Sequence, residues 1–299
     1  MTTSGGRRHP RVLVLGASGL LGCSLCPWLA QSHEVITHSR SSPTDYRIEL
    51  ADRAATSKML AHAQPDVIIN LAALTNVDAC ETNPSLAYQA NVVTVESLVA
   101  GIQNQTPGAY LINVSTDHVY DGQEPSSETA AHLVNYYAFS KYAGELAALA
   151  VRSASLRTNF FGKSYQVARV SFTDWLYRAA IEGRAITVFE DVLFSPLSIQ
   201  SLCSVIEKTI NQQPVGVFNA GSRNGMSKAD FSFAFAEEAG ISSASFARGL
   251  AGQVGRLTAR RPKDMRMDVA SIEAALGYAM PELQAEIQKA AKEYRNVSS

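Results

Sequence analysis

Short apolar runs alternate with segments of helical periodicity along the first half of the chain. The apolar runs cover residues 11–15, 35–38, 66–70 and 109–114. The first helical segment ends at about residue 31, and the others cover 52–63, 85–103 and 135–151. Continuous apolar runs are typical of strands buried on both faces, and strands that alternate with helices form parallel sheets. The pattern therefore predicts an α/β fold with a doubly wound parallel sheet.

The alternation becomes less regular after residue 162. Helices are predicted over 171–182, 198–210, 228–239 and 281–295, and short strands over 186–189 and 215–219. No linker separates the two halves. We therefore expect a first domain over residues 11–162 and a smaller C-terminal lobe over 163–299, interleaved with the last elements of the first domain at about 186–220.

A glycine-rich segment follows the first strand directly. It reads Gly16-Ala17-Ser18-Gly19-Leu20-Leu21-Gly22 and leads into a helix. In such a strand–turn–helix, the glycines permit a tight turn, close approach of a pyrophosphate, and close packing of helix on strand. The spacing G-x-x-G-x-x-G also fits a tight turn without a ligand. The context favours a dinucleotide cofactor, bound in a Rossmann-type domain.

The end of the second strand indicates which nicotinamide cofactor is used. An acidic residue there would bind the ribose hydroxyls of NADH, but the chain has Ser39-Arg40-Ser41-Ser42. A guanidinium with hydroxyls suits a 2′-phosphate, so the sequence predicts NADPH, with NADH as the alternative. Arg40 also fits a solvated loop residue.

Tyr137 and Lys141 are four residues apart in a predicted helix and therefore lie on one face. A lysine ammonium beside a phenol favours the phenolate, so we expect Lys141 to lower the pKa of Tyr137. Thr116 follows the strand over 109–114. Together the three residues predict a site that polarises and protonates a carbonyl. A packed tyrosine and a solvated lysine are the structural alternative.

Composition and charge narrow the classes of partner. The 299 residues are 46% hydrophobic and 18% charged, with a formal net charge of −1, which suits a large folded core. No basic stripe indicates nucleic acid binding, and no apolar stretch has the length of a membrane span. Residues 1–10 lack the apolar segment of a secretory signal, so we expect a cytoplasmic protein.

Four cysteines include the pair Cys23 and Cys26 in a C-x-x-C spacing. A redox or metal role would need a second such pair or a Cys/His cluster, and the sequence has none. Both residues fall in the first helix, where small side chains pack against a sheet. We therefore favour a packing role and predict no metal site.

Three segments resemble a known family. Residues 115–122, Ser-Thr-Asp-His-Val-Tyr-Asp-Gly, are close to S-T-D-Y-V-F-D-G, residues 70–78 are similar to N-A-A-A-Y-T-A-V-D, and Arg261-Pro262 with Asp268 resembles a C-terminal R-P-x-x-S-x-L-D segment. With the glycine and Y-x-x-x-K motifs, the chain resembles an extended short-chain dehydrogenase/reductase of the dTDP-4-dehydrorhamnose reductase group over residues 11–295.

The resemblance implies roles for individual residues. Thr116 would hydrogen-bond the substrate carbonyl, Tyr137 would protonate it, and Lys141 would hold the nicotinamide ribose. Gly19, Leu20 and Leu21 would donate N–H groups to the pyrophosphate. The implied cofactor-binding residues are Gly16, Ser18, Gly19, Leu20, Leu21, Gly22, Ser39, Arg40, Glu49, Leu50, Ala72, Ala73, Leu74, Thr75, Asn91, Tyr137 and Lys141. The implied substrate-binding residues are Thr75, Thr116, Asp117, Phe160 and Arg261.

The implied activity is NAD(P)H-dependent reduction of the 4-keto group of a nucleotide-linked deoxysugar, by a protein that can form a homodimer. Residues 157–162 and 190–197 differ from the family pattern on the substrate side, which leaves the sugar open. One alternative is a nucleotide-sugar epimerase or dehydratase. The other is a non-catalytic regulatory subunit that binds a dinucleotide, similar to the beta subunit of methionine adenosyltransferase.

Overall fold

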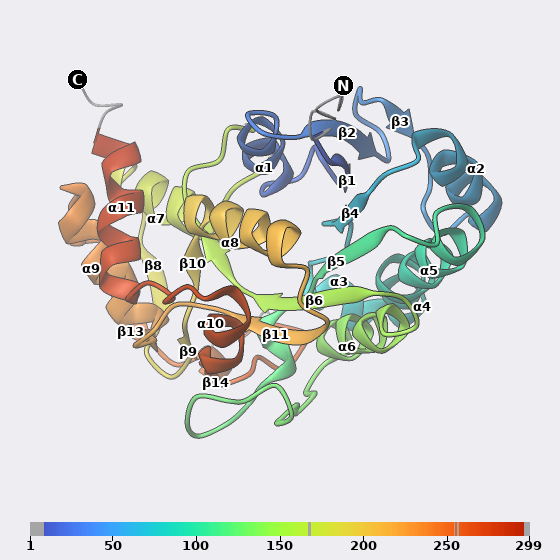
Figure 1. Cartoon of the computed structure of the whole chain (residues 1–299). Coiled ribbons are helices and arrows are strands. Elements are labelled where there is room, and N and C mark those ends of the chain that lie inside the picture. Colours follow the sequence, from blue (N-terminus) through green and yellow to red (C-terminus); the bar gives the residue numbers. More distant parts are fainter. Residues whose placement is uncertain (1–8, 167–168, 254, 256, 296–299) are drawn as a thin grey trace.

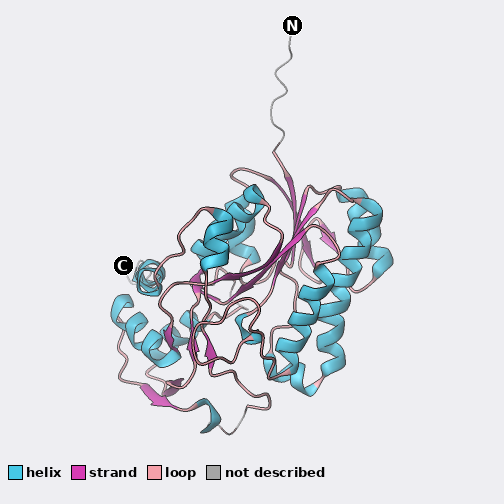
Figure 2. Cartoon of the chain, turned by 60° about the horizontal axis from the view of Figure 1, so that its bottom comes forward, coloured by secondary structure: helices cyan, strands magenta, loops and turns pink. Residues whose placement is uncertain are grey.

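A seven-stranded parallel sheet forms the centre of the computed structural model, which describes residues 9–166, 169–253, 255 and 257–295 (Figures 1 and 2). Its strand order is β11-β6-β5-β4-β1-β2-β3. The strands are β1 (Arg11–Leu15), β2 (Glu34–Ser39), β3 (Tyr46–Arg47), β4 (Val67–Asn70), β5 (Tyr110–Val114), β6 (Ser153–Thr158) and β11 (Gly216–Ala220). Every neighbouring pair is parallel, which confirms the predicted fold class.

Helices cover both faces of this sheet (Figure 1). One face carries α2 (Arg53–Ala63), α5 (Thr94–Gln105) and α6 (Tyr136–Ala148), and the other carries α1 (Gly22–Leu29), α8 (Ile199–Gln212) and α10 (Ala270–Leu276). Side chains of β1 alternate between the two cores, with Val12 and Val14 in one and Leu13 and Leu15 in the other. Both cores are apolar, which explains the continuous apolar runs in the sequence.

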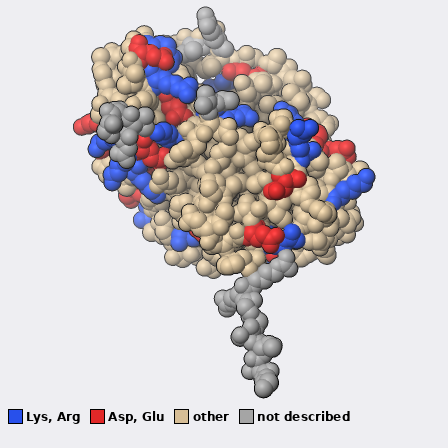
Figure 3. Space-filling view, turned by 90° about the horizontal axis from the view of Figure 1, so that it is seen from above, with Lys and Arg blue, Asp and Glu red and all other residues tan. Residues whose placement is uncertain are grey.

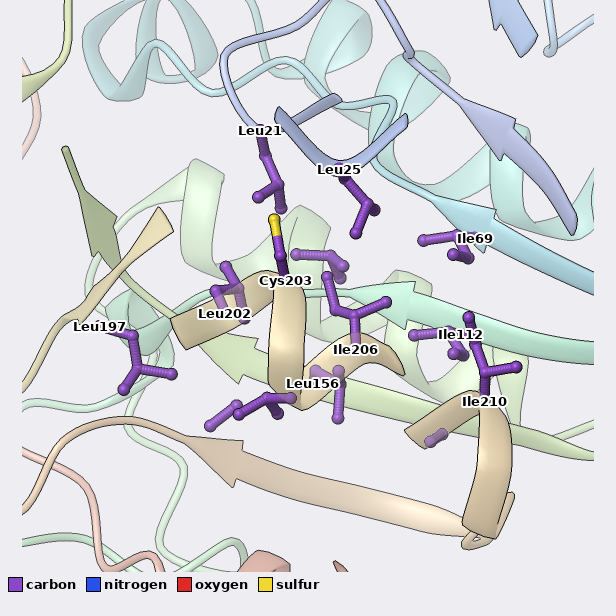
Figure 4. Close-up of a cluster of buried hydrophobic side chains, with 14 of the residues drawn as sticks. Leu21, Leu25, Ile69, Ile112, Leu156, Leu197, Leu202, Cys203, Ile206 and Ile210 are labelled. Carbon is purple, nitrogen blue, oxygen red and sulfur yellow. The ribbon is translucent and has the colours of Figure 1, made fainter. Parts of the chain in front are cut away.

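The core under α1 and α8 brings the glycine-rich segment against distant parts of the chain. In Figure 4, Leu21 and Leu25 lie above Cys203 and Ile206 of α8, with Ile69 and Ile112 of the sheet beside them. Cys26 packs against the same core, and burial raises the pKa of its thiol to about 12. Reactive redox cysteines have lowered pKa values, so this thiol has the character of a packing residue.

The second lobe has its own core and its own small sheets. Its helices are α7 (Phe172–Ile181), α9 (Lys228–Ala239) and α11 (Leu283–Arg295). Strand β8 (Ile186–Phe189) pairs with β13 (Phe246–Gly249), and β9 (Leu193–Phe194) pairs with β12 (Met226–Ser227) and β14 (Asp264–Met265). Within residues 186–220, therefore, β11 joins the large sheet and α8 covers it, whereas β8 and β9 belong to the second lobe.

Side-chain caps set where the main helices begin. Asp52 accepts N–H bonds at the start of α2, Asn135 does so for α6 and Ser227 for α9, and Ser171 and Asp174 form a capping box at α7. These residues satisfy backbone donors that the first helical turn leaves free. The Asn135 cap fixes the register of α6, which carries Tyr137 and Lys141.

The predicted helix over residues 85–103 is wrong as a single α-helix. The structure has α4 (Pro84–Tyr88), a π-helical turn over Gln89–Val93 and then α5, preceded by α3 (Val77–Thr82). A π-turn accommodates one extra residue and is common at functional sites. Here it contains Asn91. The helix α6 passes so close that a side chain at Gly144 would lie 2.5 Å from the Asn91 carbonyl oxygen.

A buried ion pair joins α6 to the sheet. The side chains of Arg157 in β6 and Glu145 in α6 are 2% and 1% exposed, and their charged groups approach to 2.7 Å. Arg157 also donates to the Tyr120 hydroxyl and to the Glu128 carbonyl, each at 2.7 Å, and Ser115 donates to the Glu145 carboxylate. Every nitrogen and oxygen atom of the two charged groups thus has at least one hydrogen-bond partner, which buried charges require.

The charges on the surface are mixed in sign. On the face shown in Figure 3, Lys and Arg side chains alternate with Asp and Glu around the rim. Among the helices that the structure describes, none has the length and apolarity needed to cross a membrane.

The buried ion pair gives a prediction about stability. Glu145→Gln would leave the Arg157 guanidinium buried without its counter-ion, and such a loss typically costs about 3–5 kcal/mol. We expect the free energy of unfolding, measured by urea titration, to fall by about this amount. Glu182→Gln is the control, because Glu182 and Arg184 form an exposed pair, which contributes at most about 1 kcal/mol. Equal losses in both variants would contradict the prediction.

Candidate active site

The candidate site lies at the carboxyl edge of the large sheet, where β1, β4 and β5 end. Loops at this edge, next to the point where the strand order reverses, bind ligands in open α/β sheets. The glycine-rich segment follows β1, residues 71–75 follow β4, and Ser115-Thr116-Asp117 follow β5. Three segments that are far apart in the sequence therefore meet at one place.

The glycine-rich segment forms a tight turn against the loop after β4. Gly16 has φ +81°, and a side chain there would lie 3.0 Å from the Ala72 backbone nitrogen. The N–H groups of Gly16 and Ala17 both donate to the His38 carbonyl. A side chain at Gly22 would lie 2.6 Å from the Ala17 carbonyl oxygen. The glycines are therefore required for the turn itself, before any ligand is considered.

The turn leaves fewer N–H groups for a pyrophosphate than we expected. The Gly19 N–H donates to the Gly16 carbonyl at 2.9 Å and helps to close the turn. Within the described part of the chain, the N–H groups of Leu20 and Leu21 take no part in the hydrogen bonds of this turn. These two groups, at the start of α1, can bind an anion. Ser18 lies beside them and is half-buried.

The residues expected near the adenosine lie at the ends of β2 and β3. Ser39 is buried and donates to the Ser42 carbonyl at 2.5 Å, so its hydroxyl holds the loop. Arg40 is exposed and forms no ion pair with the residues that the structure describes. Glu49 is also exposed, whereas Leu50 is packed in the core under α2. Arg40 and Glu49 are thus accessible to a ligand.

Asn91 holds the loop after β4 in place. Its side-chain oxygen accepts from the Leu74 N–H at 2.8 Å, and its side-chain nitrogen donates to the Leu74 carbonyl at 3.1 Å and to the Ser140 hydroxyl at 2.9 Å. Ser140 in turn donates to the Tyr137 carbonyl. Asn91 therefore connects the loop that contains Ala72, Ala73 and Thr75 to the helix that contains Tyr137. We assign it a positioning role.

The structure brings Thr116, Tyr137 and Lys141 together, as the sequence predicts. All three are buried, with 4%, 7% and 5% of their surface exposed. The Thr116 hydroxyl is close enough to Tyr137 to act on the pKa of the phenol, and it donates to the Asp117 carboxyl at 3.4 Å. Lys141 donates from Nζ to the Val114 carbonyl at 2.7 Å, at the end of β5.

The expectation that Lys141 lowers the pKa of Tyr137 is wrong for this structure. Burial raises the pKa of the phenol, and this effect exceeds the opposite effect of the Thr116 hydroxyl. Burial lowers the pKa of Lys141 to about 8. Burial shifts both pKa values toward the neutral form because the surroundings solvate charge poorly, and Lys141 still carries its proton near pH 7. Tyr137 therefore carries its proton near neutral pH.

The substrate side of the site includes a buried carboxyl group. Asp117 is fully buried, and its Oδ2 accepts from the Asn159 side chain at 2.8 Å. Burial raises its pKa to about 6. Asn159 was not among the predicted site residues, although it precedes Phe160, which is half-buried and pairs with Leu197.

Arg261 has a protein partner in the structure. Its guanidinium donates to both carboxylate oxygens of Asp78, at 3.0 and 2.7 Å. Asp78 also accepts from the N–H groups of Thr258 and Ala259. This ion pair ties the second lobe to the start of α3. A phosphate at Arg261 would share the guanidinium with Asp78.

The described residues contain no cluster of three or more His, Cys, Asp and Glu side chains that could hold a metal ion.

Asp117 gives a prediction about pH. Its pKa is about 6 in the folded protein, against an ordinary 3.8, so ionisation costs stability as the pH rises through this range. Asp117→Asn avoids that cost, because its amide does not ionise. We measure the free energy of unfolding of the variant and of the parent chain by urea titration at several pH values. The difference, variant minus parent, should increase by about 2–3 kcal/mol between about pH 4 and pH 7.5.

Asp78→Asn is the control for this experiment. Hydrogen bonds from Arg261 lower the pKa of Asp78, so its stabilising effect is lost only below about pH 3.8. The stability deficit of Asp78→Asn should then change little over the same pH range. A constant difference between Asp117→Asn and the parent chain would contradict the raised pKa.

Two known proteins are similar to most of the chain in sequence. The dTDP-4-dehydrorhamnose reductase of Mycobacterium tuberculosis is 32% identical over 271 residues, which cover 81% of this chain and 82% of that protein. Methionine adenosyltransferase 2 subunit beta of Rattus norvegicus is 26% identical over 276 residues, covering 88% of this chain and 81% of that protein.

A solved structure and a family model match nearly the whole chain. The dTDP-4-dehydrorhamnose reductase of Bacillus anthracis, in complex with NADP, has a TM-score of 0.86 at 23% identity, and the match covers 95% of this chain and 99% of that chain. At that identity the likeness shows the fold. The model of the RmlD substrate binding domain matches residues 10–296, and the chain belongs to this family.

Proposed function

We propose that the protein is an NAD(P)H-dependent oxidoreductase that reduces the 4-keto group of a nucleotide-linked deoxysugar. The observation that carries this proposal is the buried group of Thr116, Tyr137 and Lys141, placed beside the glycine-rich turn at the carboxyl edge of the sheet. The family and the reductase from Mycobacterium tuberculosis support the same reaction and substrate class.

Each of the three residues has a distinct task in this reaction. Tyr137 holds a proton on Oη, because burial raises its pKa, and it donates this proton to the carbonyl oxygen. Thr116 donates a hydrogen bond to the same oxygen as negative charge develops there. Lys141 is anchored by the Val114 carbonyl and keeps two further N–H donors for a ribose hydroxyl. A bound nicotinamide would supply the hydride.

NADPH is the cofactor that the described residues fit best. The N–H groups of Leu20 and Leu21 are not used in the hydrogen bonds of the glycine-rich turn, so they can donate to a pyrophosphate at the start of α1. Arg40 is exposed at the end of β2, where it can bind a 2′-phosphate. NADH lacks that phosphate, so it would lose the contact with Arg40.

Two alternatives predict different results. Dehydratases on this fold need an extra acidic pair next to the catalytic hydroxyl, and here Asp117 is followed by His118. An epimerase would hold its nicotinamide tightly through purification. A regulatory subunit, which the similarity to the rat protein suggests, would bind a dinucleotide without hydride turnover.

The first experiment is a nicotinamide oxidation assay with a dTDP-4-keto-6-deoxy sugar made in situ. We expect oxidation of NADPH, with NADH used less well because Arg40 has no phosphate to bind. Equal use of the two cofactors would contradict the role of Arg40. No oxidation of either cofactor, when binding of one is detected, would contradict the proposed reaction and favour the regulatory alternative.

Tyr137→Phe tests the proposed proton donor. The variant lacks the hydroxyl but keeps the ring, so we expect turnover to fall by about 10²–10⁴-fold while NADPH affinity stays within a few-fold. Turnover in this assay and NADPH binding by fluorescence titration measure the two effects. Tyr136→Phe is the matched control, since Tyr136 is the neighbouring residue on α6 and is 46% exposed. Full turnover by Tyr137→Phe would exclude the assignment.

We also propose that the protein forms a homodimer through α6. Large apolar side chains on one side of this helix and its C-cap are about half exposed, namely Tyr136, Phe139, Leu146 and Leu149. Such exposed apolar surfaces often mark interfaces. Light scattering at micromolar concentration should give twice the mass of one chain, and a single-chain mass would contradict the proposal. The cytoplasmic location stays a prediction, which cell fractionation can test.

A further inference from the structure

Lys228 is a half-buried cation on the second lobe. It is the first residue of α9, and its Nζ lies 5.6 Å from the ring centre of Phe194 and 5.9 Å from that of Phe172. In the part of the chain that the structure describes, no carboxylate oxygen lies within 4.0 Å of this ammonium. Its contacts with protein are therefore aromatic rings, which stabilise a cation less than a counter-ion does.

The position is unfavourable for a lysine in the protein alone. The first turn of a helix carries a partial positive charge and favours acidic residues. Arg261 adds a second positive charge nearby, and burial with this repulsion lowers the pKa of Lys228. Side chains that violate local preferences in this way are expected at functional sites.

The charged and titratable groups near Lys228 are those of the substrate side. Lys228 interacts electrostatically with Asp117, which lies beside Thr116, and with His118. The His118 ring packs edge-on against Tyr137, with 5.4 Å between ring centres. The Nδ1 atom of His118 is buried without a hydrogen-bond partner among the described residues. The second lobe therefore places a cation within electrostatic reach of Asp117 and of His118, whose Nδ1 atom lacks a partner among the described residues.

We propose that Lys228 is a substrate-binding residue whose ammonium binds a phosphate of the nucleotide sugar. This inference rests on the proposed function. A 4-keto deoxysugar carries no charge, so the phosphates are the anions that such a substrate would bring to the site. An ammonium–phosphate contact gives the charge-assisted hydrogen bonds that Lys228 lacks in the protein alone. The Asp117 carboxylate repels a phosphate, whereas the Lys228 ammonium attracts one. The two charges together therefore orient the substrate, with its phosphates at Lys228.

The test compares binding of dTDP and of NADPH by isothermal titration calorimetry, with the full chain and its variants. We expect Lys228→Met to weaken dTDP binding by about tenfold or more and to leave NADPH affinity unchanged. Lys228→Arg, which keeps the charge, should retain most of the dTDP affinity. In the reductase assay, Lys228→Met should raise KM more than it lowers kcat, because the phosphates lie away from the reacting carbonyl.

Lys208→Met is the matched control. Lys208 is also half-buried and lies 4.6 Å from the ring centre of an aromatic residue, Tyr278, but it is on α8, outside the candidate site. Its removal should leave dTDP affinity unchanged. A urea titration adds a further readout, since a lysine that binds substrate can be replaced without loss of stability, whereas a structural counter-ion for Asp117 cannot.

Two results would overturn the proposal. One is equal dTDP affinity in Lys228→Met and the parent chain. The other is a loss of dTDP affinity that comes with lower stability and equally weakened NADPH binding, which would show damage to the fold. Failure of the proposed function gives a different result, in which the parent chain binds NADPH but not dTDP, and this result also excludes the phosphate contact at Lys228.

Discussion

The geometry of the candidate site depends on the buried ion pair between Arg157 and Glu145. Arg157 fixes the end of β6, and Glu145 lies one helical turn beyond Lys141 on α6. Ser115, which directly precedes Thr116, donates to the same carboxylate. One pair thereby fixes the helix that carries the proton donor and the turn that carries its hydroxyl partner. Catalysis by positioned hydrogen bonds requires such fixed geometry, because the groups must not reorganise as charge develops.

The sequence predicts those parts of the fold that have a clear hydrophobic pattern or a turn that requires glycine. The runs at β1, β4 and β5 are recognisable because both faces of the sheet are covered, and the glycine-rich turn because Gly16 and Gly22 have no room for a side chain. The π-turn at Asn91 was missed because one extra residue hardly changes an apolar pattern. Strand β8 looks like β11 in sequence, and only the pairing shows that they belong to different sheets.

The candidate site was predictable where spacing alone brings residues together. Tyr137 and Lys141 share a helix face, and Thr116 follows a strand that ends at the same edge. The pKa of Tyr137 was not predictable, because it depends on how deeply the tertiary structure buries the phenol. The partner of Arg261 was missed for a similar reason, since Asp78 is 183 residues away in the chain. Lys228 could have been noticed in the sequence because it is a cation at the start of a predicted helix, where acidic residues are favoured.

The two sides of the site differ in how completely their polar groups are paired. On the cofactor side, Asn91, Lys141 and Ser39 have hydrogen-bond partners within the protein, and the donors that stay available are the N–H groups of Leu20 and Leu21 and the exposed Arg40. On the substrate side, a carboxyl group with a raised pKa lies near a lysine with a lowered one. Poorly solvated charges of this kind are costly in the free protein, and a ligand that pairs with them recovers the cost. A phosphate that pairs with Lys228 would recover part of this cost, which is the physical reason to expect the anionic part of the substrate on this side of the site.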